Sequence, residues 1–162
     1  MTSKLPFPSL AVSLAPLLQR IPVEQQPLFI AAAERLAAER YRSWAESATS
    51  PDAKSALLAC ADRENQIARL VESVYPNVAT IQREMLVHIP DLVEAGRAYF
   101  APYSTEEQFA LQAQGERLGA ATWRAFAKHA SDEKAREVFL DCALLEEQSA
   151  EYLESIANGP TT

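Results

Sequence analysis

The sequence predicts an all-α protein, a four-helix bundle built from a tandem duplication of a helical-hairpin unit. Three observations predict it: scarce glycine among many helix-forming residues, a self-similarity at one fixed spacing, and apolar stripes of helical periodicity. Only four of the 162 residues are glycine, and 48% are hydrophobic. A sheet fold would need more turn glycine and more β-branched residues. A chain of this length can bury a core as one domain, which we expect to span residues 1–162.

The overall charge argues against two classes of partner. A formal net charge of -7 and a pI near 4.9 repel phosphate groups, so we expect neither nucleic acid nor membrane as a partner. No run reaches the roughly 18 apolar residues that a membrane helix needs. Prolines interrupt the apolar stretch after Lys4, so we do not expect a signal peptide. Two cysteines are too few for a secreted disulfide framework, and a cytoplasmic location is therefore expected.

An internal repeat appears when the sequence is shifted against itself by 82 residues without a gap. Between residues 34 and 73, 16 of the 40 positions are identical to their partners. The register extends upstream, where Pro8 meets Pro90 and Leu10 meets Leu92. The sequence therefore predicts two copies, at approximately 7–74 and 89–156. Two copies are too few for a solenoid, so we expect them to close on each other.

The first copy is predicted to hold a short apolar segment followed by two long helices. We expect the long helices at residues 24–48 and 51–74. Ser50, Pro51 and Asp52 start the second of them with an N-cap residue, a proline at the first helical position and an acidic side chain in the first turn. The short segment is expected to cover the bundle or to form a homodimer interface, through Leu10, Leu14, Leu17 and Leu18.

The second copy repeats this order. Its apolar connecting segment, residues 76–104, has the length of the crossover that joins two helical hairpins in some bundles. Long helices are expected at residues 105–130 and 132–157. Ser104 and Glu107 form a capping box at the start of the first.

Each long helix carries an apolar stripe that advances in alternating steps of four and three residues. One glutamate interrupts each stripe at about the same distance from the hairpin turn, so we expect four carboxylates to meet in one layer of the core. These are Glu34, Glu64, Glu116 and Glu146. Other stripe residues are expected to be core packing, among them Tyr41, Trp44, Cys60, Trp123, Phe126 and Cys142.

Four buried carboxylates need a neutralising partner, since burying even one costs several kcal/mol. The candidates are metal cations, shared protons and arginine side chains. The arginines that recur in both copies lie off the stripes, at Arg35, Arg42, Arg117 and Arg124. We therefore predict that the four glutamates are metal ligands. The alternative that they lie at the stripe edges, solvated or paired with arginine, stays open.

Glu34 and Tyr41 on one helix, Glu64 on the next, and the repetition of the pair by Glu116 and Glu146 resemble the ferritin-like superfamily, within it the rubrerythrin-like branch. The resemblance covers the four long helices. It implies a bundle in which a glutamate from each of two helices and a Glu-x-x-His motif from each of the other two hold a di-iron centre.

The sequence departs from that family where the two histidine ligands would lie. Ile67 and Ser149 occupy those positions, and His88 and His129 lie outside the stripes. A histidine-bearing site for dioxygen or peroxide chemistry is therefore not expected, and we leave open whether the protein is an enzyme. A site made of oxygen ligands alone suits Fe or Mn, as well as Mg or Ca. The alternative is a metal-free ferritin-like bundle that acts as an interaction or small-ligand-binding module.

Overall fold

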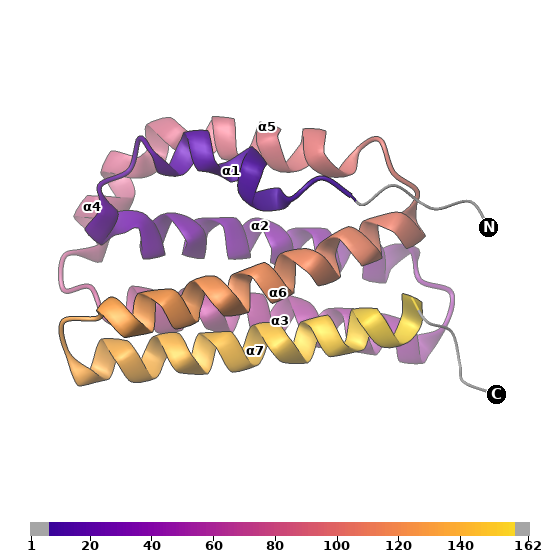
Figure 1. Ribbon diagram of the computed structural model, residues 1–162. Coiled ribbons are helices and arrows are strands. Elements are labelled where there is room, and N and C mark those ends of the chain that lie inside the picture. The colour runs from indigo at the N-terminus through magenta and orange to yellow at the C-terminus, as the bar shows by residue number, and fades with distance from the viewer. Residues whose placement is uncertain (1–6, 158–162) are drawn as a thin grey trace.

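The computed structural model describes residues 7–157, which fold into helices with no strand among them (Figure 1). The all-α prediction is confirmed. In chain order the elements are α1 (Leu10–Leu18), the 3-10 helix η1 (Val23–Gln25), α2 (Gln26–Ser47), α3 (Pro51–Glu72), α4 (Val78–Met85), the 3-10 helix η2 (Leu86–His88), α5 (Ile89–Phe100), α6 (Thr105–His129) and α7 (Glu133–Ala157).

The four long helices begin and end within about two residues of the predicted boundaries. Their predicted start signals are present. The Ser50 side chain accepts a hydrogen bond from a backbone N–H of the first turn of α3, and Ser104 and Glu107 form the capping box of α6. At the start of α7, Asp132 Oδ1 accepts from the backbone N–H of Ala135 at 2.8 Å. Local side-chain caps thus explain where α3, α6 and α7 start, whereas α2 starts without one.

The long helices form two antiparallel hairpins, α2 with α3 and α6 with α7. The turn of the first hairpin and the turn of the second lie at opposite ends of the molecule (Figure 1). The hairpins meet closely where α3 packs against α7. By contrast, the backbones of α2 and α6 do not approach closely, and side chains such as Tyr41 bridge the two helices beside the carboxylate site and a cavity.

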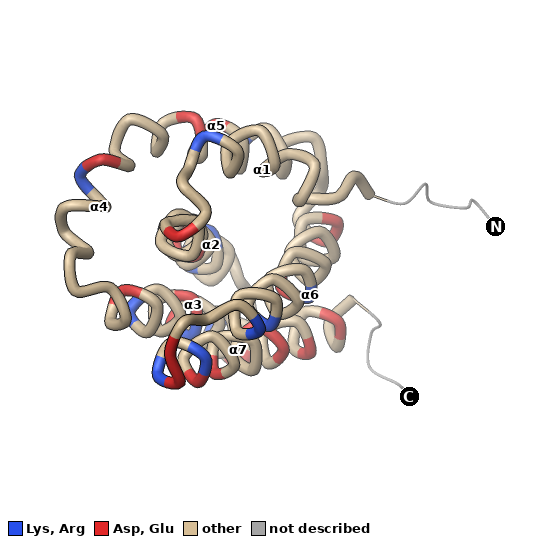
Figure 2. Tube along the Cα trace, turned by 60° about the vertical axis from the view of Figure 1, so that its left-hand side comes forward, with Lys and Arg blue, Asp and Glu red and all other residues tan. Residues whose placement is uncertain are grey.

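The shorter helices cover the open side of this arrangement. The segment α4–η2–α5 runs from the end of α3 back along the bundle to the start of α6, and α1 packs beside α5. Seen end-on, α2 lies between the arch of α4, α5 and α1 and the layer of α3, α7 and α6 (Figure 2). Leu17 of α1 is buried, and Leu14 and Leu18 pack against the main core. Of the two expected roles for this segment, the structure shows it covering the bundle.

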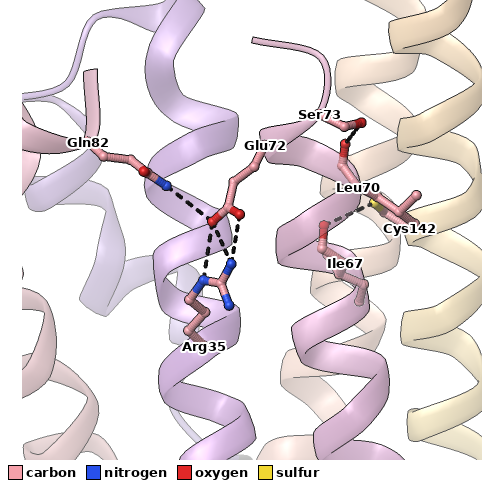
Figure 3. Close-up of polar contacts among 7 residues, drawn as sticks. All are labelled: Arg35, Ile67, Leu70, Glu72, Ser73, Gln82 and Cys142. Carbon is pink, nitrogen blue, oxygen red and sulfur yellow. Dashed lines mark hydrogen bonds and ion pairs between the residues drawn. The ribbon is translucent and has the colours of Figure 1, made fainter. Parts of the chain in front are cut away.

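The predicted apolar stripes face the interior, where nearly all their residues are buried or half-buried; only Ile156, near the end of α7, is exposed. The repeated arginines lie outside, as expected. Arg35 on α2 forms an ion pair with Glu72 on α3 at 2.7 Å, and Gln82 of α4 donates to the same carboxylate (Figure 3). None of the helices among residues 7–157 is long and apolar enough to cross a membrane.

Positions 82 residues apart make matching contacts. The Arg35–Glu72 ion pair has its counterpart in Arg117–Glu154, also at 2.7 Å. The Gln26 side chain donates to the carbonyls of Leu18 and Ile21, and Gln108 donates in the same way to Phe100 and Tyr103. Each of these glutamines therefore ties the start of a long helix to the end of the short helix before it.

Candidate metal centre

The four stripe glutamates come from four different helices and converge in the middle of the bundle. Glu64 on α3, Glu116 on α6 and Glu146 on α7 are at most 2% exposed, and Glu34 on α2 is half-buried. One carboxylate oxygen from each of Glu34, Glu64 and Glu146 lies within 4.8 Å of the others. Glu116 is close enough to act electrostatically on all three. The stripe-edge alternative does not describe these side chains, since three of them are in the interior.

A hydrogen-bond network that crosses from α2 to α6 holds one oxygen of Glu116. Tyr41 Oη donates to Glu116 Oε1 at 2.6 Å, and Gln112 Nε2 donates to the same oxygen at 2.7 Å. Arg40 Nη1 in turn donates to Gln112 Oε1 at 2.9 Å, which orients the amide. Glu116 is therefore fixed through one oxygen only.

Glu64 on α3 and Glu146 on α7 have donors of their own. Trp123 Nε1 donates to Glu146 Oε1 at 2.8 Å. The Ser149 hydroxyl donates to Glu64 Oε1 at 3.4 Å and accepts from Arg63 Nε at 3.0 Å. Ser149, at a histidine position of the ferritin-like pattern, thus contacts a carboxylate of the cluster.

Two buried carboxylate oxygens, Glu64 Oε2 and Glu116 Oε2, have no hydrogen-bond partner in the part of the chain that the structure describes. Leaving a buried acceptor unpaired costs about 1–3 kcal/mol, and more when it is charged. Oxygen donors of this kind suit the hard cations Mg, Ca, Mn and Fe(II). The donor set therefore fits a cation that binds between the four helices.

Burial raises the pKa values of three of these groups. Desolvation by burial, reinforced by the nearby Glu116 carboxylate, raises the pKa of Glu34 to about 7. Burial followed by the neighbouring carboxylates also raises the pKa values of Glu64 and Glu146 well above 4.5. Without a cation, the cluster is therefore neutralised at least in part by protons.

Two aromatic residues expected to be core packing do more than pack. Tyr41 and Trp123 are fully buried, as expected, but both donate hydrogen bonds to the cluster. A signal was present in the sequence: they occupy equivalent positions in the two copies, seven residues after Glu34 and Glu116, and both carry a polar hydrogen.

Arg40 was missed for a different reason. It is half-buried between α2 and α6, and burial lowers its pKa to about 10. The arginines that the sequence marks recur in both copies, whereas the residue equivalent to Arg40 is Thr122. Nothing in the repeat marks it.

The remaining candidates lie where the sequence places them. Ile67 is fully buried, His88 is half-buried in η2, and His129 is exposed at the end of α6. Cys60 and Cys142 are free, buried thiols whose pKa values are raised by burial. Cys142 Sγ lies 3.9 Å from the Ile67 carbonyl oxygen (Figure 3), a contact typical of a buried core cysteine.

Comparison of the chain with protein-family models, curated proteins and solved structures finds no match. The function of the site is therefore inferred from its own geometry.

Proposed function

We propose that the chain is a ferritin-like protein, related to the rubrerythrin-like branch and built by duplication of a helical hairpin with a preceding short helix. Support comes from the matching contacts of positions 82 residues apart. The helix order supports it as well, because α1, α2 and α3 correspond to α5, α6 and α7 at that spacing. The long segment between the hairpins agrees with the crossover of ferritin-like bundles.

The function that the geometry supports best is binding of a divalent cation, Fe(II) or Mn(II), by Glu34, Glu64, Glu116 and Glu146. The observation that carries this proposal is the approach of three carboxylate oxygens to within 4.8 Å of one another in the core. A cation held by these residues would offset the repulsion of the carboxylates, and Glu64 and Glu116 each have an unpaired oxygen to offer.

In such a site the chain's own residues orient the ligands. Tyr41 and Gln112 hold Glu116, and Trp123 holds Glu146, each through Oε1. A bound Fe or Mn ion would supply Lewis-acid or redox chemistry at this point. With isoleucine and serine at the histidine positions, oxygen atoms are the donors on offer, which favours hard cations over those that prefer imidazole.

A second candidate function is a metal-free bundle that binds a small ligand or a partner. The raised pKa values favour it, because protons shared among Glu34, Glu64 and Glu146 also neutralise the cluster. Shared protons would also pair Glu64 with Glu34 and Glu116 with Glu146, so the two candidate functions differ in whether a cation is bound.

Metal content distinguishes the two. Protein purified without an affinity tag or chelator is analysed for elements, and chelator-treated protein is titrated with Mn(II) and, without oxygen, Fe(II). We expect about one or two ions per chain. The double variant Glu64→Gln/Glu146→Gln should bind none.

The matched control is Glu72→Gln/Glu154→Gln, which removes carboxylates from the same two helices, in ion pairs at the surface. This control should bind metal as the unaltered protein does. If instead the core variant is more stable to heat and no metal is lost, the metal-free function is correct, because removing unneeded buried charge stabilises.

A further inference from the structure

A cavity of about 330 Å³ opens beside the carboxylate cluster, between α1, α2, α5 and α6. Its walls are mainly aliphatic, with Leu10, Leu14 and Leu18 from α1 facing Ile30, Leu36 and Leu118 from the long helices. Glu34, Glu116 and Glu146 also line it. Pockets of this size and lining hold small organic molecules.

Close packing of the helices does not require all the glycines that line this cavity. Three of the four glycines of the sequence, Gly96, Gly115 and Gly119, line the cavity, and all three lie inside helices. A glycine there costs about 0.5–1 kcal/mol relative to alanine. Only Gly119 is needed for packing, because a Cβ there would lie 2.5 Å from Glu146 Oε1.

At the other two glycines an alanine would fit. A Cβ at Gly115 would meet Leu10 Cδ2 at 3.5 Å, an ordinary contact, and one at Gly96 would meet the flexible end of Arg40 at 3.4 Å. The equivalent residues in the first copy are Ala33 and Leu14. The second copy has thus lost side-chain volume on one wall at a cost in helix stability, which is expected where open space is useful.

The polar groups that line the cavity indicate which functional group a bound molecule would carry at one end. Of the three carboxyl groups that line the cavity, that of Glu34 is half-buried, whereas Glu116 and Glu146 are at most 2% exposed. The cation that lines the cavity, Arg40, already donates to Gln112 and lies 4.0 Å over the Phe100 ring. An anionic ligand would be repelled by the three carboxyl groups, whereas a hydroxyl can donate to the accessible one, Glu34.

We propose that this cavity binds an uncharged, medium-chain aliphatic molecule with a single hydroxyl end. The alkyl part packs against the leucines, and the hydroxyl group reaches the carboxylate cluster at Glu34, its half-buried member. Binding requires the cavity, and it does not require a metal ion.

Calorimetric titration of chelator-treated protein at neutral pH tests this with octanol and octanoate, which share an alkyl chain and differ in charge. Octanol should bind at one site per chain, with octanoate weaker by about tenfold or more. Absence of octanol binding, or equal binding of the two probes, overturns the proposal.

Blocked variants test the location. Gly115→Leu fills the cavity from α6 and should weaken octanol binding by about tenfold or more. The control Ala121→Leu, at an exposed position of the same helix that does not line the cavity, should bind octanol as the unaltered protein does. Ala33→Leu, on α2, provides a second blocked variant should the first fail to fold. Octanol binding that survives in a folded blocked variant would place the ligand elsewhere. Manganese uptake without octanol binding contradicts only this proposal, and octanol binding without metal uptake contradicts only the metal site.

Discussion

Glu116 is a carboxyl group whose two oxygens have opposite surroundings. Oε1 accepts hydrogen bonds from Tyr41 and Gln112, and Oε2 has no partner among the described residues. Tyr41 and Gln112 therefore fix the orientation of this carboxyl group at the cluster. Removing one of these hydrogen-bond donors should therefore change the free energy of unfolding by a measurable amount.

Replacing Tyr41 with phenylalanine should lower the free energy of unfolding by about 1–2 kcal/mol, because Glu116 loses a buried donor but keeps Gln112. Denaturant unfolding of the metal-free protein measures this. The control is Tyr152→Phe, in a half-buried tyrosine outside the hydrogen-bond network of the cluster. It should change the free energy by less than about 0.5 kcal/mol. Equal losses in the two variants would mean that the Tyr41 hydroxyl does not support Glu116.

At the scale of single elements, α6 packs against α7 on one side and lines the cavity on another. Its two glycines, Gly115 and Gly119, lie one turn apart and both face the cavity. A Cβ at Gly115 would make an ordinary contact, but one at Gly119 would collide with the Glu146 carboxylate. The same substitution should therefore have opposite effects at the two positions.

Gly115→Ala should stabilise the protein by about 0.5–1 kcal/mol through helix propensity. Gly119→Ala should destabilise it by about 1–2 kcal/mol, since the displaced Glu146 loses its bond from Trp123. It should also weaken Mn(II) binding. Thermal unfolding and metal titration of the two variants check both expectations. Stabilisation of both variants would show that Glu146 has room to move.

At the scale of the whole molecule, the carboxylate cluster couples folding to pH. The pKa of Glu34 is raised from 4.5 to about 7 in the folded chain, and those of Glu64 and Glu146 are raised as well, first by burial. At pH values between the ordinary glutamate pKa of 4.5 and the raised pKa values of the folded protein, the folded protein binds more protons than the unfolded chain. Its stability therefore falls as pH rises through this range. Surface carboxyl groups with lowered pKa values, such as Glu94 and Glu154, act below this window.

We therefore expect the melting temperature of the metal-free protein to fall between about pH 5 and pH 8. The variant Glu34→Gln/Glu64→Gln should show a smaller fall, because its amides do not titrate. Added Mn(II) should oppose the fall, since it binds the deprotonated carboxylates. Melting curves across this range, with and without Mn(II), measure all three effects. An unchanged slope in the double variant would place the titrating groups elsewhere.

Much of the fold could be predicted because its signals are local. Ser50 and Ser104 marked helix starts through side chains that cap the next turn, and the stripe spacing marked the inner faces. Glu34 could be placed beside Glu64, and Glu116 beside Glu146, because the two members of each pair lie at about the same distance from their own hairpin turn. The hydrogen-bond donors to the glutamates could not be assigned from the sequence. Tyr41 donates to Glu116 on α6, in the other hairpin, whereas its equivalent Trp123 donates to Glu146 on α7, in its own hairpin.

The sequence by itself determined the helical class, the boundaries of the long helices and the convergence of four glutamates, three of them buried, because periodicity, caps and turn spacing act within a few residues. Only the tertiary structure decided that the backbones of α3 and α7 approach closely, whereas α2 and α6 are bridged by side chains. That arrangement creates the cavity, brings Arg40 to the site and leaves Glu116 Oε2 unpaired. These outcomes depend on distances between segments that are far apart in the chain. The combined volumes of all the side chains between the helices determine those distances.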